Sequence, residues 1–141
     1  MIPVHKIPVI WLTGSNPPNP APLRMSKYFP SATRVNQDDR DELIATLKAI
    51  SGPHVMLIEQ NVLPHSVLPH YVIDPLLLNA GLSVGFLCRN LVNNACESLP
   101  TPAVWSVEKL LHSAQSNAIP GRADIYIPTV LASWHTNPDA R

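Results

Sequence analysis

Charged side chains are scarce in this sequence. Asp, Glu, Lys and Arg make up 14% of its 141 residues, and ten acidic residues balance ten basic ones, so the formal net charge is zero. Proteins that bind nucleic acid without sequence preference are usually clearly basic. The composition therefore argues against non-specific nucleic-acid binding. It favours a protein partner or a homo-oligomer, because weakly charged surfaces associate readily.

Cysteine is nearly absent, and long apolar runs are missing. Cys88 and Cys96 are too few for a disulfide framework and lack the spacing of a metal site, so we expect two reduced thiols and no cofactor. No apolar run approaches the roughly 20 residues that a membrane span needs. Pro3, Lys6 and Pro8 interrupt the apolar N-terminus, which makes it a poor signal peptide. These features predict a cytoplasmic protein that does not bind membranes.

Proline, by contrast, is abundant. The sixteen prolines are spread along the chain, which indicates short elements and rigid connections. We expect residues 14–35 to form a Pro-rich N-terminal loop or arm, which either packs back over the core or lies on a partner. Its aromatic residues Tyr28 and Phe29 are interface candidates, as is Trp134 before a polar, flexible tail at 135–141, because aromatic side chains dominate interaction hot spots.

The stretch from Asp38 to Leu63 carries the strongest structural signal. Asp39 and Glu42 have the spacing of a capping box at the start of an amphipathic helix, which Gly52 and Pro53 end. An apolar strand, residues 54–59, follows at once. Apolar residues on both of its faces are typical of a parallel sheet covered by helices.

The rest of the chain continues the alternation of strands and helices. We therefore predict a single α/β domain spanning residues 1–141, with three layers and a mainly parallel sheet. Strands are expected at 7–13, 54–59, 83–89 and 122–127, and helices at 38–51, 75–80 and 103–117, with a final turn near residues 130–134. Asp74 should cap the second helix and Gly81 should end it. The third helix should open at Thr101 and Pro102 and place Trp105 in the core.

Candidate chemistry is confined to the carboxyl end of the 54–59 strand. Glu59 ends that strand, His65 and His70 close two successive VLPH turns, and Asp74 follows. Ligands of open α/β sheets bind at such strand ends, so these four residues are weak candidates for acid–base catalysis or metal binding. The alternative is that the two histidines are solvated loop residues, since their spacing matches no known ligand pattern.

Residues 40–119 resemble the cell-division inhibitors of the SOS response, the SulA family, and their ImuA relatives. The similar pieces are LIATLKAIS before HVMLIEQNVLP, then NAGL, WSVEKLLHS and NAI. The resemblance implies a RecA-like domain without a nucleotide-binding loop that binds the tubulin-like division GTPase and blocks its polymerisation. Pro53 and His54 stand where that family places an aromatic and a basic residue, and none of its contact residues can be carried over.

Three functions follow as hypotheses. We expect first a non-enzymatic interaction module, such as an inhibitor of the polymerising division GTPase, because no catalytic motif such as G-x-S-x-G is present. The first alternative is a small enzyme or ligand-binding domain with its site at the carboxyl end of the 54–59 strand. The second is a subunit of a larger assembly that docks through residues 14–35.

Overall fold

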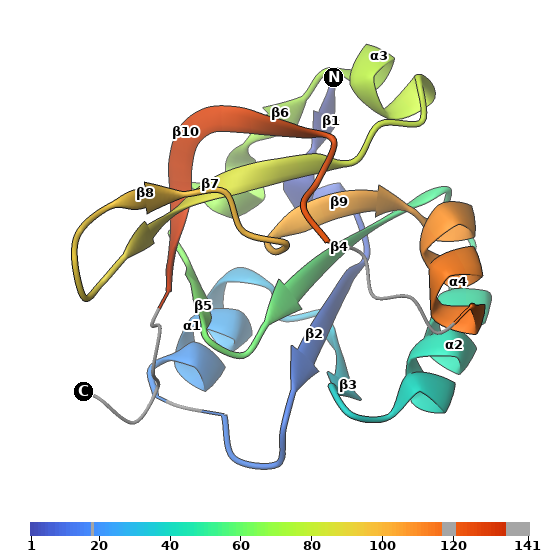
Figure 1. Ribbon diagram of the computed structural model, residues 1–141, viewed down its shortest axis with the longest axis horizontal. Coiled ribbons are helices and arrows are strands. Elements are labelled where there is room, and N and C mark those ends of the chain that lie inside the picture. The colour runs from blue at the N-terminus through green and yellow to red at the C-terminus, as the bar shows by residue number, and fades with distance from the viewer. Residues whose placement is uncertain (18, 117–120, 135–141) are drawn as a thin grey trace.

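The computed structural model describes residues 1–17, 19–116 and 121–134, and shows one large sheet with helices around it (Figure 1). The predicted flexible tail at 135–141 lies outside these residues. The strands of the large sheet lie in the order β3 (Thr33–Asn36), β2 (Val9–Thr13), β4 (His54–Glu59), β9 (Ala103–Ser106), β7 (Val84–Asn90), β10 (Ile125–Trp134) and β5 (Val62–Pro64), and β8 (Cys96–Glu97) also pairs with β7. A separate pair is formed by β1 (Ile2–Pro3) and β6 (Val72–Ile73). The helices are α1 (Ala21–Tyr28), α2 (Arg40–Ala49), α3 (Pro75–Asn79) and α4 (Val107–Gln115), with short 3-10 turns η1 (Val4–Lys6) and η2 (Leu68–His70).

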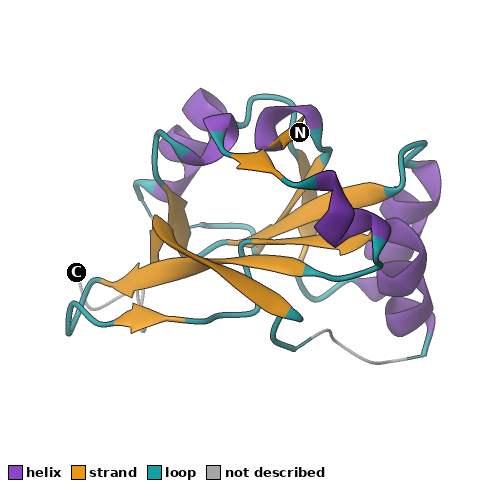
Figure 2. Cartoon of the chain, turned by 90° about the horizontal axis from the view of Figure 1, so that it is seen from above, coloured by secondary structure: helices purple, strands orange, loops and turns teal. Residues whose placement is uncertain are grey.

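The sheet is mixed, so the prediction of an α/β fold is confirmed and that of a mainly parallel sheet is wrong. Parallel pairs join β2 to β3 and β4, and β7 to β10, whereas β9 pairs antiparallel with both β4 and β7. The prediction failed because residues 103–117 were expected to form one helix, and the first four of them form β9 instead. The sheet curls into a half-barrel rather than lying flat between two helical layers (Figure 2).

The Pro-rich segment at 14–35 is more regular than expected. It contains α1, which begins after Pro20 with Pro22 in its first turn, and it reaches into edge strand β3. Proline is well tolerated in the first turn of a helix, where its missing N–H has no partner to lose. Ala21, Met25 and Phe29 from this segment are buried in the core. Of the two placements considered, the segment therefore packs back over the core.

The unit formed by α2 and β4 agrees with the sequence prediction. The Asp39 side chain caps α2 by accepting a hydrogen bond from the Glu42 backbone N–H at 3.0 Å. The reciprocal bond of a capping box is replaced, because a Glu42 carboxylate oxygen accepts from the Asn36 N–H at 3.5 Å. Beyond β4, α3 begins at its predicted cap Asp74 and ends before Gly81, whose φ of +78° suits glycine.

The C-terminal half differs most from the prediction. The true cap of α4 is Ser106, which accepts from the Lys109 N–H at 3.3 Å. Residues 130–134, expected to form a final turn, instead extend β10, which pairs with β7 on one side and β5 on the other. Pro128 cannot donate to this ladder, and the register shifts between Ile127 and Val130.

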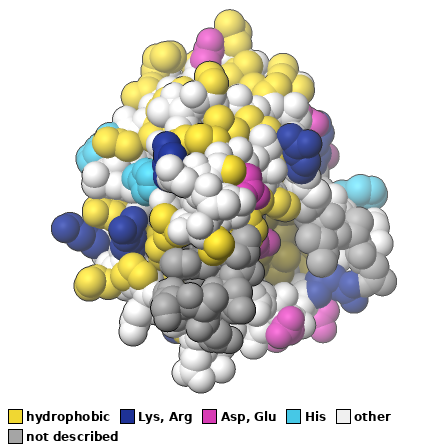
Figure 3. Space-filling model, turned by 60° about the vertical axis from the view of Figure 1, so that its left-hand side comes forward, with side chains coloured by type: hydrophobic (Ala, Val, Ile, Leu, Met, Phe, Trp, Pro, Cys, Tyr) yellow, Lys and Arg dark blue, Asp and Glu magenta, His cyan; other side chains and the backbone are white. Residues whose placement is uncertain are grey.

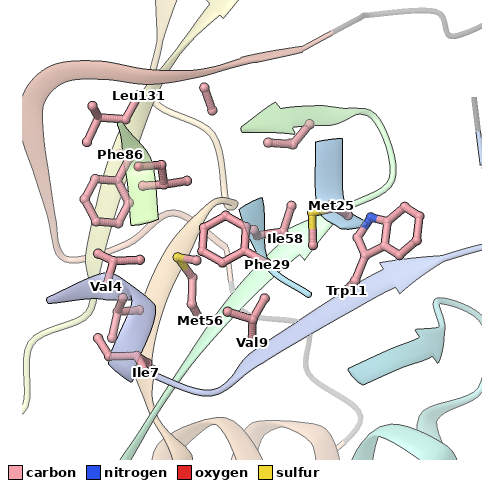
Figure 4. Close-up of a cluster of buried hydrophobic side chains, with 14 of the residues drawn as sticks. Val4, Ile7, Val9, Trp11, Met25, Phe29, Met56, Ile58, Phe86 and Leu131 are labelled. Atoms are coloured by element: carbon pink, nitrogen blue, oxygen red, sulfur yellow. The ribbon is translucent and has the colours of Figure 1, made fainter. Parts of the chain in front are cut away.

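Two hydrophobic clusters lie on opposite faces of β2 and β4. Side chains alternate along a strand, so Trp11 and Ile58 belong to one cluster while Ile10 and Leu57 belong to the other. The larger cluster fills the concave side of the sheet and includes Val4, Ile7, Val9, Trp11, Met25, Phe29, Met56, Ile58, Phe86 and Leu131 (Figure 4). The smaller cluster lies between the sheet and the neighbouring helices α2 and α4, which stack at one side of the molecule (Figure 2).

The structure also bears on membrane insertion. In the part of the chain that it describes, no helix combines the length and the apolar character that crossing a bilayer requires.

Candidate functional site

A cleft of about 450 Å³ opens at the carboxyl ends of the three parallel strands. Leu12 near the end of β2, Asn36 at the end of β3 and Glu59 at the end of β4 all line it. The start of α2 closes one side, and Figure 1 shows the arrowhead of β3 between that of β2 and this helix. This edge of parallel strands is where open α/β sheets bind ligands.

The walls of the cleft are mostly apolar. Its floor is formed by Leu12 and Leu57 from the sheet, and its sides by Leu43 from α2 and Leu110 and Ala114 from α4. All five belong to the smaller hydrophobic cluster or pack against it. The cleft is therefore an opening into the side of that cluster, and it can accept the apolar part of a ligand.

Glu59 is the charged group that faces this apolar space. It lies two residues after Leu57 on β4, so both side chains point to the same face of the sheet. Burial raises the pKa of the Glu59 carboxyl above its usual value. Among the residues that the structure describes, no hydrogen-bond donor and no cation contacts this carboxylate. Glu59 is thus a half-buried acid that forms no ion pair with the residues the structure describes.

Further charges stand at the mouth of the cleft. Asp38, Asp39 and Arg40 line it at the start of α2. Together with Glu59, they give the lining three carboxylates and one guanidinium, so its electrostatic potential favours a cation. The N-terminus of α2 would otherwise attract an anion, but Asp39 already caps it.

Trp105 and Thr101 complete the lining on the side of β9. The Trp105 ring is partly exposed and forms a wall of the cleft, and its indole N–H is buried and finds no hydrogen-bond partner among the residues that the structure describes. The Thr101 hydroxyl accepts a hydrogen bond from the Glu59 backbone N–H at 3.2 Å. That bond joins β4 to the segment before β9 and fixes the position of Glu59. A flat aromatic wall near a carboxylate suits a ligand that is both apolar and positively charged.

The structure places the other candidates from the sequence elsewhere. His65 follows β5, and its Nε2 lies 2.7 Å from the Ser133 hydroxyl oxygen. The His70 ring lies at the far end of η2, 6.3 Å from the ring of His5. The Asp74 carboxylate accepts a hydrogen bond from the Leu76 N–H at 2.9 Å as the cap of α3.

These four residues therefore do not form one site. No hydrogen bond or ring contact joins any two of Glu59, His65, His70 and Asp74. Within residues 1–17, 19–116 and 121–134, no three His, Cys, Asp or Glu side chains lie close enough to share a metal ion. Only Glu59 faces the cleft.

The aromatic interface candidates are buried to different degrees. Phe29 belongs to the hydrophobic core, whereas Tyr28 and Trp134 are partly exposed and pack against it. The large apolar side chains that are exposed include Leu23, Val67, Leu76 and Val92. Figure 3 shows hydrophobic side chains along the top of one face, with basic and His side chains on both of its sides.

Comparison with models of known protein families and with curated proteins finds no match for this chain. The resemblance to the SulA family therefore stays a prediction. Its fourth piece, WSVEKLLHS, begins on strand β9 and continues into α4, and its last piece, NAI, lies outside the described residues.

Sequence reasoning found Glu59 but missed its neighbours. Asn36, Thr101, Trp105 and Leu110 come from distant parts of the chain and meet at the cleft only because β9 inserts beside β4. No spacing in the sequence indicates that pairing. Trp105 was expected to lie in the core, on the face of a helix.

Proposed function

We propose that this protein binds a small organic cation in the cleft at the end of β4. The ligand would carry an amine or guanidinium group on an apolar or aromatic body. The observation that carries the proposal is Glu59, a half-buried carboxylate in a mostly apolar cleft, which forms no ion pair with any described residue, Arg40 at the mouth included. Burying an unpaired charge is unfavourable, so a carboxylate in such a place fits a ligand that supplies the missing positive charge.

The rest of the lining supports the same class of ligand. The ammonium group would pair with Glu59, and the Trp105 ring would lie against the apolar body. Asp38 and Asp39 at the mouth would raise the local concentration of cations. An anionic ligand would have to approach three carboxylates, so we do not expect phosphates or carboxylic acids to bind here.

Titration calorimetry with matched probes tests this proposal. Phenethylamine, 2-phenylethanol and 3-phenylpropionate share an apolar ring and differ in the charge of the polar end. We expect the amine to bind about tenfold or more tightly than the alcohol, because a charge-assisted hydrogen bond is worth roughly 1.5–3 kcal/mol. Glu59→Gln should remove this preference, and Glu108→Gln, on the exposed first turn of α4, should keep it. Equal binding of amine and alcohol, or no binding of either, would overturn the proposal.

A protein-binding role is the second candidate, and the exposed side chains favour it. Leu23, Leu76 and Val92 are each more than 60% exposed. Such side chains mark a site of protein association where they form a contiguous patch, whereas single ones are common on any protein surface. For the specific role of an inhibitor of the division GTPase, light scattering of the polymerising GTPase with added protein is the test. Unchanged polymer at an equimolar ratio would reject that role.

A further inference from the structure

His65 lies in a second polar cluster, away from the cleft. It follows β5, and its Nε2 lies 2.7 Å from the hydroxyl oxygen of Ser133 on β10. Ser133 lies directly opposite Arg89 of the neighbouring strand β7, so the two side chains leave the sheet on the same face. Arg24 reaches the same region from α1, where its Nη1 donates to the Pro64 carbonyl at 3.3 Å. Four separate elements thus bring these side chains together.

The charge of this cluster is all of one sign. Burial lowers the pKa of the His65 imidazole, and the positive charges of Arg24 and Arg89 nearby lower it further. Strand β8, which pairs with β7 next to Arg89, carries one carboxylate, that of Glu97. Glu97 pairs opposite Cys88, on the other face of β7, and accepts a hydrogen bond from the Asn90 side-chain amide at 2.7 Å. No carboxylate of the described residues neutralises the two guanidinium groups.

We propose that Arg24, His65, Arg89 and Ser133 form a binding site for a phosphate group, carried by a small phosphomonoester. Each guanidinium has five N–H donors in a planar fork, and the contacts described here use only a part of them. Neutral His65 can accept a hydrogen bond from the Ser133 hydroxyl at Nε2 and keep its Nδ1–H for the ligand. A phosphate dianion has more acceptor oxygens than a carboxylate, so it can accept hydrogen bonds from two guanidinium groups and an imidazole at the same time.

The cluster is held in place before any ligand binds. The Pro64 carbonyl anchors Arg24, and Arg89 Nη1 donates to the backbone oxygen and to Oδ1 of Asn94, at 3.4 and 3.1 Å. Ser133 is buried between two paired strands, so its hydroxyl cannot move far. A site whose donors are already oriented loses little side-chain entropy when it binds.

Phosphate titrations of the full chain, followed by NMR of the His65 imidazole, test the site. The probes are inorganic phosphate and glycerol phosphate, with chloride at the same ionic strength as the comparator. We expect both phosphates to shift the His65 ring signals saturably and chloride to leave them unchanged. Arg24→Gln and Arg89→Gln should each weaken binding about tenfold or more.

Lys27→Gln is the matched control, because Lys27 is an exposed cation on the same helix as Arg24. It should leave phosphate affinity within about twofold, because the charge of an exposed side chain is screened by solvent and contributes little. If Arg89→Gln unfolds, as judged by urea denaturation, Arg24→Gln alone decides, because Arg24 lies on a different element, the helix α1. Equal weakening by Arg24→Gln and Lys27→Gln, or the same shift with chloride, would overturn the proposal.

Discussion

Glu59 connects the stability of the protein with the cleft. Its carboxyl has a pKa raised above the ordinary value of 4.5, so the folded protein holds this proton more tightly than the unfolded chain. Below pH 4.5 both states are protonated. As the pH rises through the folded pKa, the folded state loses that advantage, and the free energy of unfolding falls.

The variant Glu59→Gln should therefore be more stable than the parent protein at pH 7 and above, and differ little near pH 4. The measurement is urea denaturation across pH 4–8 for both proteins. The same variant should lose amine binding as it gains stability, because a carboxylate that is kept for ligand binding lowers the stability of the free protein. A variant that is less stable at pH 7 would show that the Glu59 charge has a partner in the folded state.

Gly85 packs so closely against the neighbouring strand that a side chain at this position would be crowded. A Cβ atom at this position would lie 2.5 Å from a ring carbon of Tyr126, directly opposite on β10. The ring cannot move aside easily, because the Tyr126 hydroxyl accepts from the Ala123 N–H and donates to the Leu99 carbonyl. Glycine at this position therefore reflects packing between two strands and no special backbone angle.

We expect Gly85→Ala to lower the free energy of unfolding by about 1–3 kcal/mol, the usual cost of overpacking a core. Thermal or urea denaturation measures it. Gly52→Ala serves as the control, because a Cβ atom there meets nothing within 4 Å. If Gly52→Ala lowers the free energy of unfolding and Gly85→Ala does not, Gly85 is not constrained by its packing against Tyr126.

At the scale of elements, α2 depends on one cap. The Asp39 carboxylate satisfies the Glu42 N–H, which otherwise has no partner in the helix. Asp39→Ala should lower the free energy of unfolding by about 1 kcal/mol. Asp38→Ala removes a neighbouring carboxylate that makes no capping bond, so it should cost less. If urea denaturation shows that Asp38→Ala and Asp39→Ala lower the free energy of unfolding equally, the effect comes from negative charge at the start of the helix and not from the cap.

The elements that could be predicted are those whose signals are local. Asp39 and Asp74 as caps, Gly81 as a helix end and the apolar run 54–59 each act through neighbours in the chain, and the structure has all four. Such signals do not depend on what the element packs against.

The elements that were predicted wrongly are those whose structure depends on contacts between distant segments of the chain. Residues 103–106 are apolar enough for a helix or a strand, and their ladders with β4 and β7 make them a strand. In α1 the density of prolines hid a short helix whose buried residues, Ala21 and Met25, are one turn apart. The same holds for the candidate site. Glu59 could be predicted from its place at the end of an apolar strand, whereas the residues that face it come from distant segments and could not.

At the scale of the whole molecule, zero net charge coincides with exposed apolar side chains. Electrostatic repulsion between copies is weakest where the net charge vanishes. We therefore expect solubility to pass through a minimum near pH 7 and to rise on either side. Precipitation by polyethylene glycol across pH 5–9 measures it, and a solubility that is constant over that range would contradict the expectation.

The position of β10 bears on how the protein is made in the cell. This strand, the last that the structure describes, lies inside the sheet between β7 and β5, and Ala132 sits between Cys88 and Pro64. While the ribosome is still synthesising residues 125–134, the edges of β7 and β5 have no partner and remain open to other chains. We therefore expect the nascent chain to need protection from chaperones until Trp134 has left the exit tunnel, and to fold in one late step.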